Sequence, residues 1–383
     1  MSKVIVNECK NYDLQNVIAK VNDGVERLGG WSNFVKPGDK VLLKVNLIGP
    51  KTPESAAVTH CEFVRAIARI LKEKQCEVWV GDSAGGAIAG IAPTAQSLKV
   101  AGLEKVALEE GLILKNFDKE GVVQVKPESG FEEEMYIAKP MFDADVVINL
   151  PKLKTHSAGF YTGAVKNVFG CIPGLRKAKY HKMAPDQKNF GNIICDINKS
   201  IKIALHIMDG IIGMQGEGPT AGTPYEAHKV LVSKDPLALD TVASSMIGMN
   251  IEEIPILAAA KERKLGESSL EKIVIDGDYN RPPRLSGYKL PKRFRSSKKR
   301  NDQAVVKVID FFKARPKVNL SKCKKCNMCV ESCPVQAINK ETKEINYKIC
   351  IECMCCHELC MHKAIDLKSD NFIASVVSKM AGR

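Results

Sequence analysis

Several features that mark membrane proteins and common nucleotide-binding enzymes are missing from this sequence of 383 residues. No stretch approaches eighteen uninterrupted apolar residues, so no membrane-spanning helix is expected. The start, MSKVIVNECK, has no apolar run to serve as a signal peptide. No G-x-G-x-x-G pattern joins a strand to a helix, so no nicotinamide or flavin site is predicted. With 45% hydrophobic and 6% aromatic residues, the chain is expected to be a globular, cytoplasmic protein.

The formal net charge of +13 comes mainly from one stretch of the chain. Residues 281–300 contain nine lysines and arginines and no acid, which leaves +4 for the rest. Such a block can bind nucleic acid. However, Tyr288 and Phe294 are its only aromatic residues, and no nucleic-acid motif surrounds them. We therefore expect a basic strap that docks an acidic redox partner or solvates a linker, and no nucleic-acid function.

Cysteine is concentrated near the C-terminal end. Eight cysteines form two copies of C-x2-C-x2-C-x3-C, and the copies lie 27 residues apart. Thiolate ligands suit iron–sulfur clusters. In two-cluster proteins, the first three cysteines of each run bind one cluster and the fourth binds the other. The predicted ligands are Cys323, Cys326, Cys329 and Cys360 for one [4Fe-4S] cluster, and Cys333, Cys350, Cys353 and Cys356 for its partner.

Two other uses of these cysteines fit less well. Structural zinc sites separate their cysteine pairs by a dozen or more residues. A disulfide framework needs an oxidising compartment. Residues 318–367 instead resemble the bacterial two-cluster ferredoxins, which implies a soluble electron donor or acceptor protein as partner and an organism, such as an anaerobe, that tolerates oxygen-sensitive clusters. Cys355 lies between two predicted ligands and is expected to be a buried thiol without a ligand role.

The first 280 residues alternate short apolar runs with helical patterns, and the whole chain is too long for one core. Strands are predicted at 41–46, 76–81, 146–149, 203–208, 228–232 and 272–275, and helices at 60–74, 94–110, 235–247 and 254–264. This alternation predicts an α/β fold with a layered, mostly parallel sheet and helices on both faces.

The composition changes near residue 280, which suggests four segments. We predict an α/β ligand-binding domain over 1–280 and a basic linker or strap with a short helix (304–314) over 281–317. A small α+β two-cluster ferredoxin-like domain should follow over 318–367. The last segment, 368–383, is expected to carry a short helix at 371–380.

Polar residues follow several of the predicted strands at the same end. They are Lys44, Asn46, Asp82, Ser83, Lys152, Lys154 and Asp209. Taken singly, Asp82 and Ser83 would be ordinary helix-cap or turn residues. Ligands of such sheets, however, gather beyond the carboxyl ends of the strands. The common placement therefore predicts a site at that edge of the sheet.

The densest candidate segment is 149–174, NLPKLKTHSAGFYTGAVKNVFGCIPG. A helix predicted at 160–169 would present its amino end to an anion. Lys152, Lys154 and Lys166 would bind a carboxylate or phosphate as point charges, with Asn167 beside them. His156 has the side chain best suited to general acid–base chemistry near neutral pH. If no ligand binds here, Lys152 and Lys154 are solvated and His156 is a hydrogen-bonded structural residue.

Four motifs together resemble one protein family. They are Lys44-Val45-Asn46, GDSAGG at 81–86, PKLKTH-x6-GAVKN-x-FG from 151 and MDGIIGMQGEGP from 208. The combination resembles the family called domain of unknown function 362 over roughly residues 35–250. That family is often joined to a C-terminal two-cluster ferredoxin, as here. The resemblance implies an iron–sulfur protein. Membership of this family does not assign a reaction to it.

A fainter resemblance links 156–174 to nickel-pincer lactate racemases. In that family a histidine acts in hydride transfer and a lysine ten residues later anchors the pincer, as His156 and Lys166 are spaced here. His181 lies only approximately where that family has a nickel-binding histidine, and His60 is the sole counterpart of an upstream catalytic histidine. Those racemases also lack a ferredoxin domain. The resemblance therefore implies a shared ligand pocket, and not nickel-pincer chemistry.

Two functions remain open from the sequence. The first is a ferredoxin-dependent oxidoreductase, in which electrons pass through two [4Fe-4S] clusters to an anionic substrate or acceptor at the strand ends. In that hypothesis His156 and Lys166 are the catalytic residues. The second is a non-catalytic electron carrier whose α/β part docks a partner. A polar pocket near His156 and Lys166 would favour the enzyme, and a flat, filled surface would favour the carrier.

Overall fold

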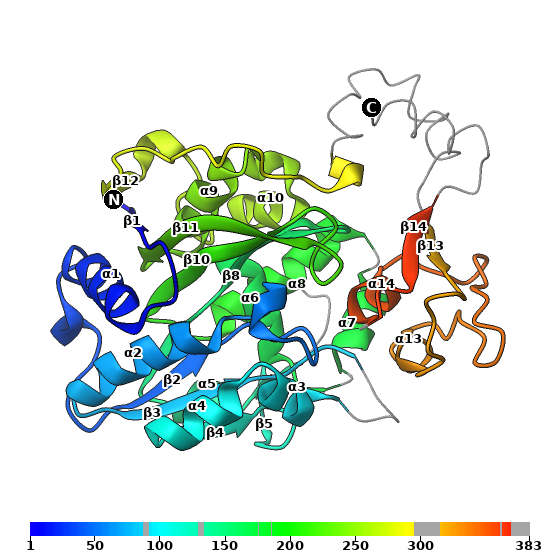
Figure 1. Cartoon of the computed structure of the whole chain (residues 1–383), viewed down its shortest axis with the longest axis horizontal. Coiled ribbons are helices and arrows are strands. Elements are labelled where there is room, and N and C mark those ends of the chain that lie inside the picture. Colours follow the sequence, from blue (N-terminus) through cyan, green and yellow to red (C-terminus); the bar gives the residue numbers. More distant parts are fainter. Residues whose placement is uncertain are drawn as a thin grey trace.

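The computed structural model describes residues 1–86, 92–128, 134–174, 176–184, 186–294, 315–360 and 362–368. A ten-stranded sheet has the order β12-β1-β11-β10-β7-β2-β3-β4, and β8 and β9 extend it beside β10 (Figure 1). Its strands are β1 (Lys3–Glu8), β2 (Lys40–Lys44), β3 (Glu77–Asp82), β4 (Ile113–Asn116), β7 (Val146–Asn149), β8 (Lys152–His156), β9 (Phe160–Thr162), β10 (Leu205–Gln215), β11 (Thr223–Ser233) and β12 (Val274–Gly277). Strands β10, β7, β2, β3 and β4 run parallel, which confirms the predicted fold class.

Helices cover both faces of this sheet. Both faces need a cover because alternate residues of β2 are apolar on opposite sides. Val41 and Leu43 join the core on one face, and Leu42 joins the core on the other. The first face is covered by α1 (Leu14–Glu26), α2 (Cys61–Glu73), α3 (Thr94–Val100) and α4 (Leu103–Glu110). The second is covered by α6 (Ala164–Asn167), α8 (Gln187–Ser200), α9 (Pro236–Met246) and α10 (Pro255–Glu262). Burial on both faces explains the continuous apolar runs of the central strands.

Shorter elements complete the α/β part. They are α5 (Pro140–Asp143), α7 (Arg176–Met183) and the hairpin of β5 (Val122–Val125) and β6 (Met135–Ala138). The helix predicted at 94–110 is divided, because Gly102 has a φ of 76° between α3 and α4. No helix within the described residues is long and apolar enough to cross a membrane.

The helix predicted at 160–169 is wrong. Residues 152–162 form the β8–β9 hairpin instead, and only α6 is helical before a 3-10 turn at Val168–Cys171. The buried carboxylate of Asp240, from α9, accepts hydrogen bonds from the backbone N–H groups of Ala164 (2.7 Å) and Val165 (2.9 Å). An internal carboxylate thus occupies the helix end that was expected to face a ligand. Burial raises the pKa of Asp240 to about 7.

The cysteine-rich segment forms a small α+β unit, as predicted. It contains β13 (Arg315–Val318), α13 (Met328–Glu331), α14 (Cys355–Leu359) and β14 (Ile365–Lys368), and β13 pairs antiparallel with β14. In Figure 1 this unit, drawn in orange and red, lies beside α7. Its two halves repeat in backbone conformation. Left-handed residues occur in pairs 27 positions apart: Lys325 and Glu352, Asn327 and Met354, and Gln336 and Lys363.

The first part of the predicted basic strap packs on the α/β part. The hydroxyl of Tyr288 donates to the backbone oxygen of Met214 at 2.5 Å, and Phe294 packs edge-on against Phe160. The helix predicted at 304–314 and the C-terminal helix predicted at 371–380 lie outside the described residues. The four segment boundaries remain predictions.

Candidate functional site

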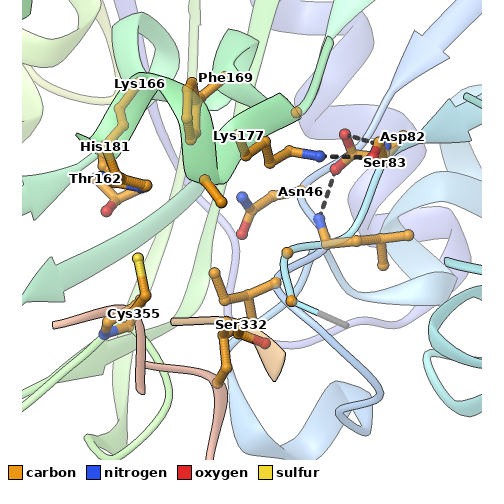
Figure 2. A pocket seen from close by; sticks show the side chains of 18 of the residues that line it. Asn46, Asp82, Ser83, Thr162, Lys166, Phe169, Lys177, His181, Ser332 and Cys355 are labelled. Atoms are coloured by element: carbon orange, nitrogen blue, oxygen red, sulfur yellow. Dashed lines mark hydrogen bonds between the residues drawn. The ribbon is translucent and has the colours of Figure 1, made fainter. Parts of the chain in front are cut away.

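A cavity of about 290 Å³ lies between the carboxyl-end edge of the sheet and the cysteine-rich unit (Figure 2). Six of the residues predicted for the site at the sheet edge line it: Asn46, Asp82, Ser83, Lys154, Lys166 and Asn167. They come together because the strands end level with one another. Lys44 at the end of β2 is opposite Gly81 of β3 and Asn149 of β7, so the loops that follow all begin at one edge.

Lys154 and two asparagines form a buried network on one wall. The ammonium of Lys154 donates to Asn46 Oδ1 at 2.6 Å and to the backbone oxygen of Ala57 at 2.8 Å. Asn46 Nδ2 donates to Asn167 Oδ1 at 2.9 Å, and Asn167 Nδ2 donates to Asn149 Oδ1 at 2.7 Å. Each polar group is oriented by its neighbour, so this wall is fixed before any ligand arrives.

Asp82 and Lys44 form a buried ion pair at the edge of the cavity. Lys44 Nζ lies 2.9 Å from Asp82 Oδ1, and both side chains are almost fully buried. Asp82 also accepts hydrogen bonds from the backbone N–H groups of Leu47 and Ser83. Burial raises the pKa of Asp82, and the charge of Lys44 opposes that effect. Lys44 therefore supports the cavity from behind, whereas Asp82 lines it.

A second chain of polar contacts joins Ser83 to two residues that the sequence did not point to. Lys177 Nζ, from α7, donates to Ser83 Oγ at 2.5 Å. Ser83 Oγ donates in turn to Asp118 Oδ1, also at 2.5 Å. Burial lowers the pKa of Lys177 to about 8, although Asp118 and Asp82 favour its protonated form. Lys177 is thus mostly a cation at neutral pH.

Lys166 and His181 lie on the same wall, with Phe169 nearby (Figure 2). The His181 ring stacks on Phe190 with 4.5 Å between centroids, and Phe169 packs edge-on against both rings. Burial lowers the pKa of His181 to about 3, and the charge of Lys166 adds to this effect. The imidazole is therefore neutral at neutral pH and is held in place by aromatic contacts.

His156 is fully buried and is not among the described residues that line the cavity. Its Nδ1 accepts hydrogen bonds from the backbone N–H groups of Ala158 (3.2 Å) and Gly159 (3.0 Å), which fixes the β8–β9 turn. Burial lowers its pKa well below the ordinary value, and Lys166 and Lys154 contribute to this. His156 is therefore neutral and structurally engaged.

Lys152 and Asp209 lie elsewhere and bind each other. Lys152 Nζ is 2.7 Å from Asp209 Oδ2, with both side chains at 0% exposure. The Tyr12 hydroxyl donates to Asp209 Oδ1 at 2.8 Å, and its ring stacks on His60. The predicted site thus divides into a group at the cavity and this separate buried cluster.

The opposite wall of the cavity comes from the cysteine-rich unit. Ser332 and Cys333 follow α13, while Cys355 and Leu359 belong to α14. A Cβ on Gly86, which has a φ of 86°, would lie 3.1 Å from Leu359. The glycines of the GDSAGG loop therefore allow this unit to approach closely. Cys355 is buried, as predicted, but it also lines the cavity.

Four of the predicted ligand cysteines meet in one small core: Cys329 and Cys356 are buried in it, and Cys333 and Cys360 pack against it. Burial raises the pKa of Cys329 to about 11, and Cys360, Cys323 and Cys326 are close enough to add to the shift. Burial likewise raises the pKa of Cys356, with contributions from Cys353, Cys350, Cys333 and also Cys329. Backbone N–H groups donate to the sulfurs of the two crossing residues: Ala337 to Cys333 and Ala364 to Cys360, both at 3.2 Å. Convergent thiols with amide donors are a suitable ligand set for a [4Fe-4S] cluster.

Within the residues that the structure describes, no group of three or more His, Cys, Asp or Glu side chains, the eight predicted cluster ligands included, is placed to hold a single metal ion.

Family comparisons agree with both halves of this description. Residues 41–245 match the family described as Domain of unknown function (DUF362), and residues 316–339 match the 4Fe-4S binding domain. The chain therefore carries at least one [4Fe-4S] domain. It is 34% identical over 284 residues to the thylakoid-associated protein sll1697 of Synechocystis sp., which covers 74% of this chain and 85% of that protein.

Solved structures show more distant likenesses. A Thermotoga maritima protein has a TM-score of 0.38 and 15% identity, covering 60% of this chain and 57% of that one. The lactate racemase apoprotein of Thermoanaerobacterium thermosaccharolyticum has a TM-score of 0.34 and 11% identity, covering 58% and 55%. The second structure is a lactate racemase, the kind of enzyme that residues 156–174 resemble. With TM-scores below 0.5, neither likeness supports a statement about the chemistry of this chain.

Proposed function

We propose that this chain, which belongs to the family described as Domain of unknown function (DUF362), is a ferredoxin-dependent oxidoreductase of the cytoplasm. It would pass electrons from a partner protein to an anionic substrate or acceptor in the cavity. One observation carries the proposal: Lys166 and His181 line one wall of the cavity, and Cys333 lines the other. A docking module would have no use for a cavity that holds charged side chains beside a predicted cluster ligand.

We further propose that the chain binds two [4Fe-4S] clusters. The two cysteine runs share their left-handed positions, and α13 and α14 begin at equivalent residues, Met328 and Cys355. Cys329 and Cys356 are buried in the same small core, so the two ligand groups adjoin. When bound, the clusters would supply electrons one at a time.

The lysines of the cavity favour an anionic ligand. Lys154, Lys166 and Lys177 line it together with only two acids, Asp82 and Glu331. Asp82 is already paired with a lysine behind the wall. Lysine ammonium groups on the wall of a partly enclosed space can bind carboxylate or phosphate groups. The apolar wall residues would contact the rest of the molecule.

His181 takes the place at the cavity that was expected for His156. A bound anion would raise the pKa of His181, because it would offset the charge of Lys166 and favour the imidazolium. Ligand binding would then be coupled to proton uptake at this ring, next to the molecule that is reduced. His156 would act as a positioning residue through the β8–β9 turn.

Metal analysis tests the cofactor assignment. Protein purified without oxygen should be brown and contain about eight iron atoms per chain and no nickel. Cys353→Ser should remove about half of the iron, because it deletes one ligand of one cluster. Cys355→Ser, two residues away, should keep all of it. Colourless protein or zinc in place of iron would contradict the redox function.

Ligand capture tests the cavity. A small anion that co-purifies with the native protein should be found by mass spectrometry and lost in Lys166→Met. Lys105→Met is the matched control, because Lys105 is 76% exposed on α4. His181→Ala should weaken retention of the anion with full iron content. A carrier without catalytic function would bind no such molecule and would still hold its iron.

A further inference from the structure

The loop before the third predicted ligand differs from the rest of the cysteine-rich unit in exposure and charge. Residues 320–326, here named the lysine loop, have the sequence LSKCKKC, with three lysines and no acid. All fourteen cysteines lie within the described residues, and Cys326 is the only one that is exposed. Cys326 therefore brings its ligand group to the surface of the described structure.

The internal repeat provides a comparison within the same molecule. Lys322, Lys324 and Lys325 correspond, 27 residues later, to Ile349, Ile351 and Glu352. Lys325 and Glu352 even share a left-handed φ, of 55° and 52°. The backbone conformation that holds the cysteines is thus formed equally well without the lysines. Their charge is not needed for folding or ligation of a cluster.

The lysines are also not used inside the molecule. All three are exposed, and within the described residues none forms an ion pair. Leu320 at the start of the loop is 63% exposed. Cations surrounding an apolar contact beside a redox centre are typical of a weak, transient electron-transfer interface.

The two ligand groups form a route from the lysine loop at the surface to the cavity. Cys326 is at the exterior, its group adjoins the second because Cys329 and Cys356 are buried in one small core, and Cys333 of the second group lines the cavity. We propose that the lysine loop is the surface at which an acidic one-electron carrier protein docks and delivers electrons to the nearer cluster. The inference rests on the proposed two-cluster function. One electron leaves the carrier and enters this chain at each encounter, and no covalent bond is made or broken.

Binding to an acidic [2Fe-2S] ferredoxin tests the surface. The anaerobic holoprotein should bind it at low ionic strength, and the affinity should fall steeply with added salt, because screening weakens contacts between exposed charges. Lys322→Glu/Lys324→Glu/Lys325→Glu should weaken binding roughly tenfold or more at low salt and abolish most of its salt dependence. The control is Lys36→Glu/Lys40→Glu/Lys74→Glu, three exposed lysines near the amino ends of β2 and β3. It carries the same change in net charge and should alter binding less than about twofold.

Two results would overturn the proposal. One is equal weakening by the two triple variants, which would mean that net charge alone attracts the ferredoxin. The other is wild-type protein that does not bind the ferredoxin at low salt. Iron content and bleaching by dithionite are measured on the same samples. If both are normal, the docking surface alone is rejected and the proposed function stands.

Discussion

The two walls of the cavity belong to parts of the molecule that are held together in different ways. The α/β part has large apolar cores on both faces of its sheet. The main core of the cysteine-rich unit consists of Cys329, Ile338, Cys356 and Ile365, and two of these four are predicted cluster ligands. So small a unit cannot bury enough apolar surface by itself. One wall is therefore fixed by ordinary folding, and we expect the other to depend on its metal.

Removal of iron should produce the largest effect, because only one of the two parts is expected to need the metal to stay folded. Removing iron with a chelator in air should unfold the cysteine-rich unit while the α/β part keeps its structure. Limited proteolysis should then cut within residues 315–368 and leave residues 1–294 resistant. Cleavage of both parts at equal rates would mean that the α/β fold also depends on the clusters.

Breaking a buried ion pair inside the α/β part should destabilise that part without loss of iron. Asp209→Asn leaves Lys152 as a buried charge without its partner, which should cost about 3–5 kcal/mol in the free energy of unfolding. Urea denaturation measures this loss, and iron content should not change. Asp143→Asn, in the exposed pair with Lys139, is the control and should cost less than about 1 kcal/mol.

Burial of Lys177 in the polar wall should change the pH dependence of its reactivity. The pKa of Lys177 is lowered to about 8, so its amine is protonated and unreactive below that pH and becomes a neutral nucleophile above it. Trace acetylation followed by mass spectrometry should show a midpoint near pH 8 for Lys177. An ordinary lysine titrates near 10.4. A midpoint above pH 10 would show that burial does not act on this amine.

The smallest effect concerns a helix cap remote from the cavity. Asp13 Oδ1 accepts a hydrogen bond from the backbone N–H of Asn16 at the start of α1. Asp13→Ala should lower the free energy of unfolding by about 1 kcal/mol. Ligand binding and iron content should remain normal. A change in either would show that the α/β part transmits strain to the cysteine-rich unit.

Features carried by local spacing could be predicted from the sequence. The thiol groups follow from the repeated cysteine runs, and the strand over Val146–Asn149 was placed correctly because β-branched residues bounded by polar ones indicate a buried strand. The polar residues after β2 and β3 converge for the same reason, since parallel strands end together.

Features set by distant contacts could not be predicted. Asp209 was expected at a strand end, but β10 continues to Gln215, and its carboxylate instead meets Tyr12 from an unpredicted part of the chain. Lys177, which no motif pointed to, comes from the mostly polar helix α7, whose position depends on packing against α8. His181 of the same helix was named only through a resemblance, which did not place it at the cavity. The approach of the cysteine-rich unit had one sequence signal, the paired glycines at 85 and 86, whose partner Leu359 lies far along the chain.

The shared cavity means that neither part encloses a ligand alone. Occupancy should therefore act as a sensor of assembly: a molecule that contacts Lys166 and Leu359 at once is retained only when both parts are in place. A chain that has lost its iron would then fail to bind the ligand at all, before any electron transfer could take place. Under iron starvation such a protein would be inactive and would leave the anion that we propose as its substrate unbound.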